Sequence, residues 1–594
     1  MLHSFHIPVL GLGYSIDTPL KVARYGISSV LSIVDDELVE RMRAYHSQKR
    51  SVPYEAIGKN ENNSRSRRIT EYLNFLSDCI KQDFKTLKQQ NFTDGSDICR
   101  YFALLPDTSK IKHGYELMME YPEGEAKQIF KSILKNAMRM GNIDVNIMAK
   151  VDKMNYADGE YTGEINTDAL AALRGFAESK LNASVILSAG MNPKLYSYIA
   201  DFADFFPDKN EFLKKRIILK VSDFRSALIQ AKFLAKKGLW VSEFRIESGL
   251  NCGGHAFATD GYLLGPILEE FKTKRSEMYL ELFEMYQLAL VKKGTLVEEK
   301  PKQKITVQGG IGTAAEHQFL LKHYQLDATG WGSPFLLVPE VTNVDTHTLI
   351  QLTGATEQDF YLSNASPLGI RFNNFKNSTI EKLRTERIEK GRPGSPCTKK
   401  YLCNNTEFTE QAICTASREF QHLKIKSLQT AGLTAEEYER QFEEVTGKIC
   451  LCEGLCASNY LKYDMLKPKE NKAVAICPGP NLAYFNDVYS FDEMVGHIYG
   501  KINLLEQIDR PHVFIKELNL YIDYLQEEVK QHLQQFSDKK MKQLNGSKLQ
   551  LAEGIDYYEK LFSEMAGQAS DEFNKLYEQL ANSKNKLDTL MVGL

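Results

Sequence analysis

Two glycine-containing turns are the residues of this 594-residue chain whose types and spacing point most directly to chemistry. An apolar strand pattern at Ile305 and Val307 runs into paired glycines, and a second short strand pattern at 328–332 ends in another glycine and a hydroxyl. Glycine lets a backbone approach a ligand closely, and amides at a loop or helix start favour an anion. Tandem turns of this kind match the phosphate site that barrel enzymes build after their seventh and eighth strands. They predict a phosphate-bearing cofactor at Gly309, Gly310, Gly332 and Ser333, although paired glycines also end ordinary strands.

A histidine in a glycine-rich loop is the candidate catalytic group. Cys252-Gly253-Gly254-His255 follows the predicted strand at 244–246. In a parallel barrel this position is the carboxyl-end rim, from which active-site groups come. Gly253 and Gly254 let the backbone pass close to a flat ligand, and an imidazole can move a proton near neutral pH. A single loop histidine is more often structural, but the shared rim with the glycine turns favours function for His255.

Repeated strand–helix units must position these residues. Eight strands are predicted, and eight favour closure into a barrel over an open doubly wound sheet. They cover residues 7–12, 28–34, 143–148, 183–188, 216–221, 244–246, 305–308 and 328–332. We therefore expect an α/β fold, a TIM (β/α)8 barrel over 1–380, with a helical insertion at about 36–140.

Five motifs resemble, in the same order, the nitronate monooxygenase (2-nitropropane dioxygenase) superfamily of FMN-dependent TIM barrels. They are 144–148, Lys220-Val221-Ser222, Gly253-Gly254-His255, Gly309-Gly310-Ile311 and 332–336. That group includes flavin enoyl-acyl carrier protein reductases, and trans-acting enoyl reductases of polyunsaturated fatty acid and polyketide synthases are similar around 218–222. The resemblance covers roughly 7–35 and 140–380 and continues through Leu368-Gly369-Ile370-Arg371 and Asn374.

The resemblance implies FMN as cofactor and a role for each matched residue. Asn146 would hydrogen-bond the flavin ring or ribityl chain, and Lys220 would place a cation near the pyrimidine edge. Gly309, Gly310, Gly332 and Ser333 would hold the phosphate, with Gly253 and Gly254 close to the cofactor. His255 would act as base or orient the substrate.

The resemblance leaves two reactions open, and a third hypothesis is a non-catalytic scaffold that retains the barrel. One is oxidation of a small activated substrate, in which His255 takes the proton next to a nitro group. The alternative is an enoyl reductase that uses NAD(P)H and acts on a carrier-bound enoyl thioester. This chain departs from the family pattern in its longer turn before Gly253, which lacks an acidic residue directly before the glycines, and in an insertion at 256–304 that we expect to form a lid.

The remaining chain is predicted to form two further regions. Residues 381–490 contain seven of the ten cysteines, and Cys450, Cys452 and Cys456 are the closest approach to a metal-ligand pattern; their spacing matches no strong template, so no metal is predicted. Residues 491–594 are predicted to be helical, packed on the barrel or forming a homo-oligomer. Their amphipathic stripe consists of Leu518, Ile522, Leu525, Val529 and Leu533.

Composition bounds the function without naming it. Hydrophobic residues make up 43% of the chain and charged residues 25%, which suits a globular protein with a sizeable core. The net charge of -3 gives no reason to expect nucleic acid, and no apolar run has the length of a membrane span. The few cysteines and the absence of a leader pattern predict a cytoplasmic protein.

Overall fold

Eight parallel strands close into a barrel. The computed structural model describes residues 2–148, 152–157, 160–188, 190–256, 261–532, 538–565 and 571–590. The strand order around the barrel is β1-β10-β9-β8-β7-β6-β3-β2, which follows the chain and confirms the predicted TIM barrel. The strands are β1 (Phe5–Ile7), β2 (Ser28–Ser32), β3 (Ile143–Ile147), β6 (Ala183–Leu187), β7 (Lys215–Val221), β8 (Val241–Glu247), β9 (Lys304–Gln308) and β10 (Ala328–Gly330).

The first strand differs from its prediction. It was expected at 7–12 but ends at Ile7, because Pro8 has no N–H to donate to a neighbouring strand. The residues that follow form a loop at the barrel mouth, and Gly11 adopts a φ of 55° there.

The barrel interior is polar at alternate strand positions. Arg245 of β8 reaches across the barrel to Asp144 of β3 at 3.5 Å and pairs with Glu243 at 2.7 Å. The same alternation brings Asn146, Lys220 and Glu247 to the carboxyl-end layer, because successive side chains of a strand point to opposite faces.

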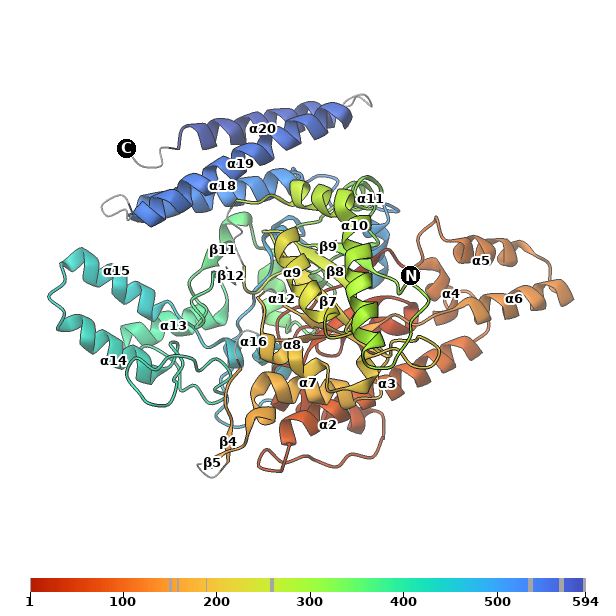
Figure 1. Ribbon diagram of the computed structural model, residues 1–594, viewed down its shortest axis with the longest axis horizontal. Helices are drawn as coiled ribbons and strands as arrows, with labels where there is room; N and C mark the ends of the chain where they lie inside the picture. The colour runs from red at the N-terminus through yellow and green to blue at the C-terminus, as the bar shows by residue number, and fades with distance from the viewer. Residues whose placement is uncertain are drawn as a thin grey trace.

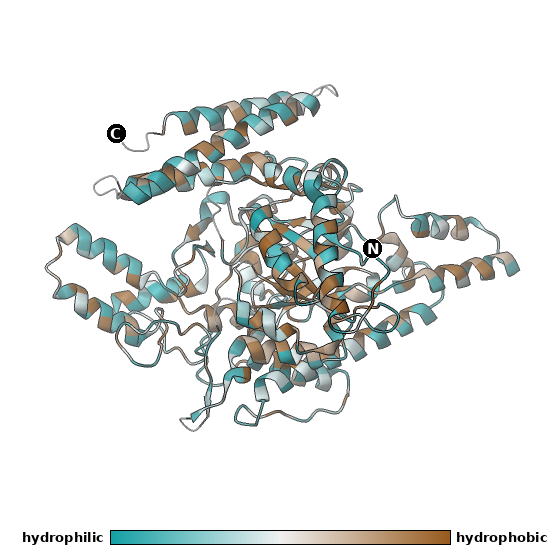
Figure 2. Ribbon diagram, viewed as in Figure 1, coloured by the Kyte–Doolittle hydropathy of each residue, from teal (hydrophilic) through white to brown (hydrophobic). Residues whose placement is uncertain are grey.

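Helices outside the barrel cover the strands (Figure 1). They include α1 (Thr18–Val22), α7 (Asp168–Glu178), α8 (Pro193–Ile199), α9 (Phe224–Ala235), α10 (Leu264–Val291) and α11 (Ala314–His323). Figure 2 shows hydrophobic and hydrophilic residues alternating along the helices around the strands.

The expected lid at 256–304 is wrong for the residues that form α10. Phe271 of this helix packs on Phe244 of β8 and on Phe224 of α9, with ring centroids 5.9 and 5.0 Å apart. A repeating apolar stripe therefore buries α10 in the outer layer instead of over the mouth. Residues 257–260 lie outside the described residues.

The segment between β2 and β3 contains α2 (Asp36–Lys49), α3 (Ser64–Gln89), α4 (Asp97–Ala103), α5 (Lys110–Glu120) and α6 (Glu125–Ala137). The first two pack together and α3 also packs on α7, so they belong to the outer layer. Helix α4 packs on α3, and α5 and α6 extend away from the barrel (Figure 1). A small hairpin, β4 (Tyr156–Ala157) and β5 (Glu160–Tyr161), follows β3.

The region after the barrel folds back onto it. It comprises α12 (Thr346–Thr353), the antiparallel pair β11 (Phe360–Ser363) and β12 (Phe372–Phe375), α13 (Thr379–Glu389), α14 (Arg418–Gln429), α15 (Ala435–Thr446) and α16 (Leu451–Lys462). Helices α13 to α15 lie on the opposite side of the barrel from α5 and α6 (Figure 1). Helix α16 of this region is largely buried.

The chain ends in α17 (Phe491–Ile498), α18 (Val513–His532), α19 (Asp538–Met565) and α20 (Asp571–Asp588), of which the last three form a layer (Figure 1). Leu518, Ile522, Leu525 and Val529 are buried within the chain, as the stripe predicts, and Leu533 lies outside the described residues. Among the described residues, no helix has both the length and the apolar character needed to cross a bilayer.

Candidate active site at the barrel mouth

A cavity of about 190 Å³ opens at the carboxyl ends of the strands. Five residues that the sequence singled out line it: Asn146, Lys220, Gly253, Gly254 and His255. Its other walls are mostly apolar and come from the β1 loop, from 368–372 and from α16. The volume is below the roughly 300–1,000 Å³ of sites for drug-sized ligands, so the cavity suits a ring-sized group.

His255 is held at the cavity by contacts on two sides. Its Nε2 lies 2.6 Å from Ser366 Oγ, and its backbone forms an antiparallel bridge with Phe372. The imidazole meets the Phe372 ring edge-on, with centroids 5.1 Å apart. Ser366 is fully buried and its Oγ also accepts from the Leu368 amide at 3.2 Å. These contacts fix the imidazole at the position that the sequence predicts for a proton-transferring group.

Lys220 lies in the cavity wall but is not an isolated cation. Its Nζ pairs with Glu247 Oε2 at 2.7 Å, and Glu247 Oε1 accepts from Gln308 Nε2 at 2.7 Å. The neighbouring carboxylate offsets the positive charge that the family resemblance assigns to this lysine. The ion pair still presents N–H donors at the mouth.

Asn146 and the paired glycines supply polar groups and space. The Asn146 side chain makes no hydrogen bond with any residue that the structure describes, so its amide remains available to a ligand. A Cβ on Gly254 would have no atom within 4 Å, whereas one on Gly253 would lie 2.1 Å from the Cys477 carbonyl oxygen. Gly253 is thus needed for chain packing, and Gly254 leaves open space.

The two glycine turns lie together but do not form a free phosphate cradle. A Cβ on Gly309 would be 2.8 Å from Asn251 Cα, and one on Gly332 would be 2.6 Å from Cys252 Cβ. Ser333 Oγ donates to the Cys252 carbonyl at 3.0 Å and accepts from the Gly479 amide at 2.7 Å. The 248–252 segment therefore occupies the space in front of both turns. These contacts argue against a phosphate at the turns, but they do not test the backbone amides, so the phosphate site stays a prediction.

An internal carboxylate takes the place of an anion at the start of α11. Glu316 Oε2 accepts from the amides of Gly312 and Thr313 at 2.8 and 3.3 Å, in a capping box. Its other oxygen pairs with Arg510 Nη1 at 2.6 Å, with both side chains less than 5% exposed. Arg510 also donates to the Gly310 carbonyl. The donors at this helix start are already used within the chain.

Several mouth residues come from regions that the sequence did not assign to the active site. Tyr401, Leu451, Cys452 and Cys477 reach the cavity from 401–477, and burial raises the pKa of Cys477 to about 12. Ser366 had no sequence signal either. Leu368 and Ile370, by contrast, lie in a motif that resembled the family's tail.

The cysteines of α16 point into different surroundings. Cys452 lines the mouth, and Cys456 Sγ donates to Asp35 Oδ2 at 3.3 Å. Across the part of the chain that the structure describes, no group of three or more His, Cys, Asp or Glu side chains is arranged to hold a metal ion.

The chain is similar to several solved structures at low identity. The enoyl reductase domain of MlnA from the macrolactin biosynthesis cluster of Bacillus amyloliquefaciens gives a TM-score of 0.39 at 12% identity, covering 94% of this chain and 97% of that chain. FabK from Thermotoga maritima gives 0.35 at 11%, covering 88% and 95%. Nitroalkane oxidase from Streptomyces ansochromogenes gives 0.25 at 12%, covering 57% and 87%. Neither protein-family models nor curated proteins gave a match. The barrel is established by the order of its own strands.

Proposed function

We propose that the barrel mouth is the active site of an oxidoreductase that holds a flavin ring in the cavity and oxidises a small activated substrate. The supporting observation is the convergence of Asn146, Lys220, Gly253, Gly254 and His255 on one cavity. These residues come from three strands or the loops that follow them, as a TIM-barrel site requires. When bound, the flavin would supply the electron or hydride transfer.

The residues present fit a flavin ring but not the phosphate of FMN at the predicted turns. Asn146 and Lys220 offer donors to the polar edge of a ring, and the open face of Gly254 admits a flat group. The glycine turns are filled by the chain itself. We therefore expect the phosphate to add little affinity, so that FMN and riboflavin bind about equally.

His255 would hold the substrate proton. Ser366 Oγ can accept from Nε2–H or donate to a bare Nε2, because a hydroxyl has one donor and two lone pairs. Nε2 has a single in-plane position, which Ser366 occupies, so with Nε2–H donating to Ser366 Oγ the substrate proton would be taken at Nδ1. The apolar walls exclude water from this proton.

A second candidate reaction is reduction of an enoyl thioester with NAD(P)H. It is favoured by the leucines around the opening, Leu12, Leu368, Leu402, Leu451 and Leu455, which suit an apolar acyl chain. Both reactions use the same cavity and differ in the electron donor.

The test is a visible spectrum of the purified full-length protein, followed by titration with riboflavin and FMN. Oxidised-flavin bands, or uptake of either compound, are expected. Anaerobic addition of a nitronate, NADH or NADPH then separates the reactions by which donor bleaches the flavin. A protein that binds neither compound would refute the proposal. FMN binding more than about tenfold tighter than riboflavin would refute the expectation that the glycine turns do not bind the phosphate.

His255→Gln tests the proton transfer. We expect the variant to keep the flavin but to lose roughly a hundredfold in turnover of a nitroalkane, the usual size of a general-base contribution. His347→Gln is the control, since His347 lies on α12 and does not line the cavity. Equal turnover in both variants would remove His255 from the mechanism.

A further inference from the structure

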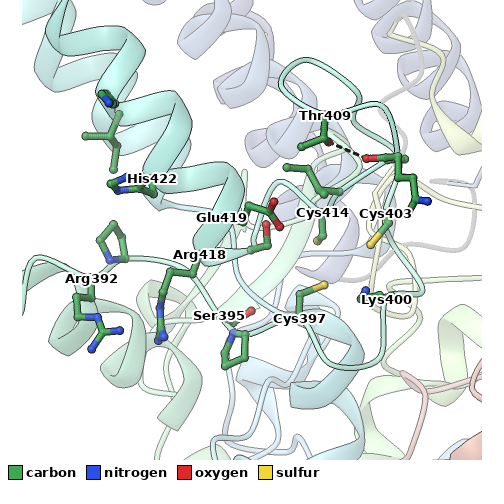
Figure 3. A pocket seen from close by; sticks show the side chains of 18 of the residues that line it. Arg392, Ser395, Cys397, Lys400, Cys403, Thr409, Cys414, Arg418, Glu419 and His422 are labelled. Carbon is green, nitrogen blue, oxygen red and sulfur yellow. Dashed lines mark hydrogen bonds between the residues drawn. The ribbon is translucent and has the colours of Figure 1, made fainter.

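A second cavity, of about 1150 Å³, lies away from the barrel mouth and contains three cysteines. It is bounded by α14 and by the loops from 391 to 417. Cys397, Cys403 and Cys414 line it, with their sulfur atoms turned toward one another (Figure 3). All three are free thiols; Cys397 and Cys403 are partly exposed and Cys414 is buried.

Backbone pairing holds two of these thiols in place. Ser395 forms a parallel bridge with Ser417, its amide donating to the Ala416 carbonyl at 3.0 Å. Cys397 and Cys414 flank this bridge, and Cys397 adopts a φ of 55°, which is uncommon for a residue other than glycine. The fold keeps Cys397 in a costly conformation that such sites often retain for function.

The third thiol, Cys403, ends a loop that starts at Cys397 and is held by contacts with Asp35 and Asp36. Between Cys397 and Cys403, Lys399 forms a buried ion pair with Asp35, and Tyr401 donates to Asp36 Oδ1 at 2.9 Å. With the loop fixed in this way, the two thiols cannot move far apart. Little further ordering is needed to join them.

The thiols of this group shift one another's pKa values. Cys403 lowers the pKa of Cys397, but Cys414 and burial outweigh it and raise that pKa to about 12. The Cys397 thiol and burial raise the pKa of Cys403 as well. The raised pKa values leave only a small fraction of thiolate at neutral pH, so exchange at these thiols should speed up as the pH rises. A disulfide between them resists reduction once it has formed, because thiols of high pKa are poor leaving groups.

The cavity around the thiols is cationic. Arg392, Lys400, Arg418 and Lys426 line it, against the one carboxylate of Glu419. None of the four cations forms an ion pair with another residue in the described ranges, and the buried Arg418 Nε has no hydrogen-bond partner there. Uncompensated cations around a cavity attract anions.

We propose that this cavity is a thiol–disulfide exchange site for a small disulfide that carries carboxylates. Cys397 attacks one sulfur of the disulfide as a thiolate, forms a mixed disulfide and releases one thiolate of the substrate. Cys403, as a thiolate, then attacks Cys397 Sγ, forms the Cys397–Cys403 disulfide and releases the second thiolate. One disulfide is reduced to two thiols while two protein thiols are oxidised to one disulfide, and the two protein protons pass to the released thiolates.

The experiment compares two disulfides on the reduced full-length protein. The probes are dithiodipropionate, which carries two carboxylates, and cystamine, which carries two ammonium groups; both release an aliphatic thiolate, so they differ mainly in charge. Peptide mass spectrometry follows formation of the Cys397–Cys403 disulfide over time. We expect the carboxylate-bearing probe to react at least about tenfold faster at low salt, with the preference falling as salt rises. Equal rates, or no Cys397–Cys403 disulfide, would overturn the proposal.

Two variants test the roles of individual residues. Cys403→Ser should accumulate the mixed disulfide on Cys397, whereas Cys79→Ser, on α3, should behave as the unmodified chain. Arg418→Gln/Lys426→Gln should remove most of the preference for the carboxylate-bearing probe, by slowing that probe and by relieving the repulsion of cystamine. The proposal would be overturned if Cys403→Ser trapped no adduct or if the double variant kept the preference. It would also be overturned by a metal ion bound to these thiols in the purified protein.

Discussion

Glu517 gives the most quantitative prediction, because it is a buried carboxylate without a cationic partner among the described residues. It lies on α18, 1% exposed, and accepts from the amides of Gly249 and Leu264, both at 2.7 Å. It thereby fastens the C-terminal helices to the segments that flank the histidine loop. Burial raises its pKa from 4.5 to about 7, and the two amide hydrogen bonds only partly offset this.

The sign of the pH effect follows from the raised pKa. The folded state favours the protonated form, so the stability contribution is complete below pH 4.5 and is lost as the pH rises through about 7. At about 1.36 kcal/mol per pH unit, the total is about 3 kcal/mol, of which roughly 2–3 kcal/mol is lost between pH 5 and pH 8. The nearby Tyr558 has a pKa raised well above 10 by burial and does not titrate in this range.

The perturbation is Glu517→Gln, which keeps the shape but cannot ionise. Urea unfolding at pH 5, 6, 7 and 8 gives the free energy of unfolding of both chains. The unmodified chain should lose about 2–3 kcal/mol relative to the variant across this range. Glu527→Gln, on the exposed face of the same helix, is the control and should show no such trend. A Glu517→Gln difference that is the same at pH 5 and pH 8 would refute the reasoning.

Three further predictions concern the mouth and its supports. Gly254→Ala should lower the free energy of unfolding by about 1–2 kcal/mol, because its φ of 81° is unfavourable for alanine. Gly253→Ala should lower it by roughly 2 kcal/mol more, because its Cβ would meet a carbonyl oxygen. Equal unfolding midpoints for the two variants would contradict this. Arg510→Met should cost about 3–5 kcal/mol by leaving Glu316 buried and unpaired, and adding Glu316→Gln should restore part of it; a denaturation midpoint unchanged by Arg510→Met would disprove the role of the pair. Ser366→Ala should shift the pH profile of nitroalkane turnover while the flavin stays bound, and an unshifted profile would show that this hydroxyl does not act on the histidine.

The barrel could be predicted because its strands carry their signal locally. Each strand is a short apolar run followed by a turn and a helical pattern, and closure adds no requirement beyond their number. The part of the site that would hold the flavin ring could be predicted for the same reason. Asn146, Lys220 and His255 lie at or just after strand ends, and the strand period alone brings such residues to one rim.

The rest of the site depends on contacts between distant segments. Ser366 meets His255 across 111 positions, and the Cys477 carbonyl bonds the Gly254 amide across an even longer separation. Nothing in residues 360–480 signals this, because their turns and apolar residues suit any packed region. The contacts that fill the space at the glycine turns could not be predicted either. Cys252 is a neighbour of the histidine in sequence, but only the fold places it against Gly332.

Electrostatic as well as steric contacts oppose a phosphate at the glycine turns. They strengthen the expectation that FMN and riboflavin bind about equally. A phosphate at the start of α11 would approach the Glu316 carboxylate and would find the amides of Gly312 and Thr313 already bonded. Arg510 offsets the charge of Glu316, but it is committed to that carboxylate, to Asn481 and to the Gly310 carbonyl. Opening the turns would therefore require moving both 248–252 and the segment that precedes α18. Because that segment also carries the C-terminal helices, phosphate binding would be opposed by the same contacts that stabilise the fold.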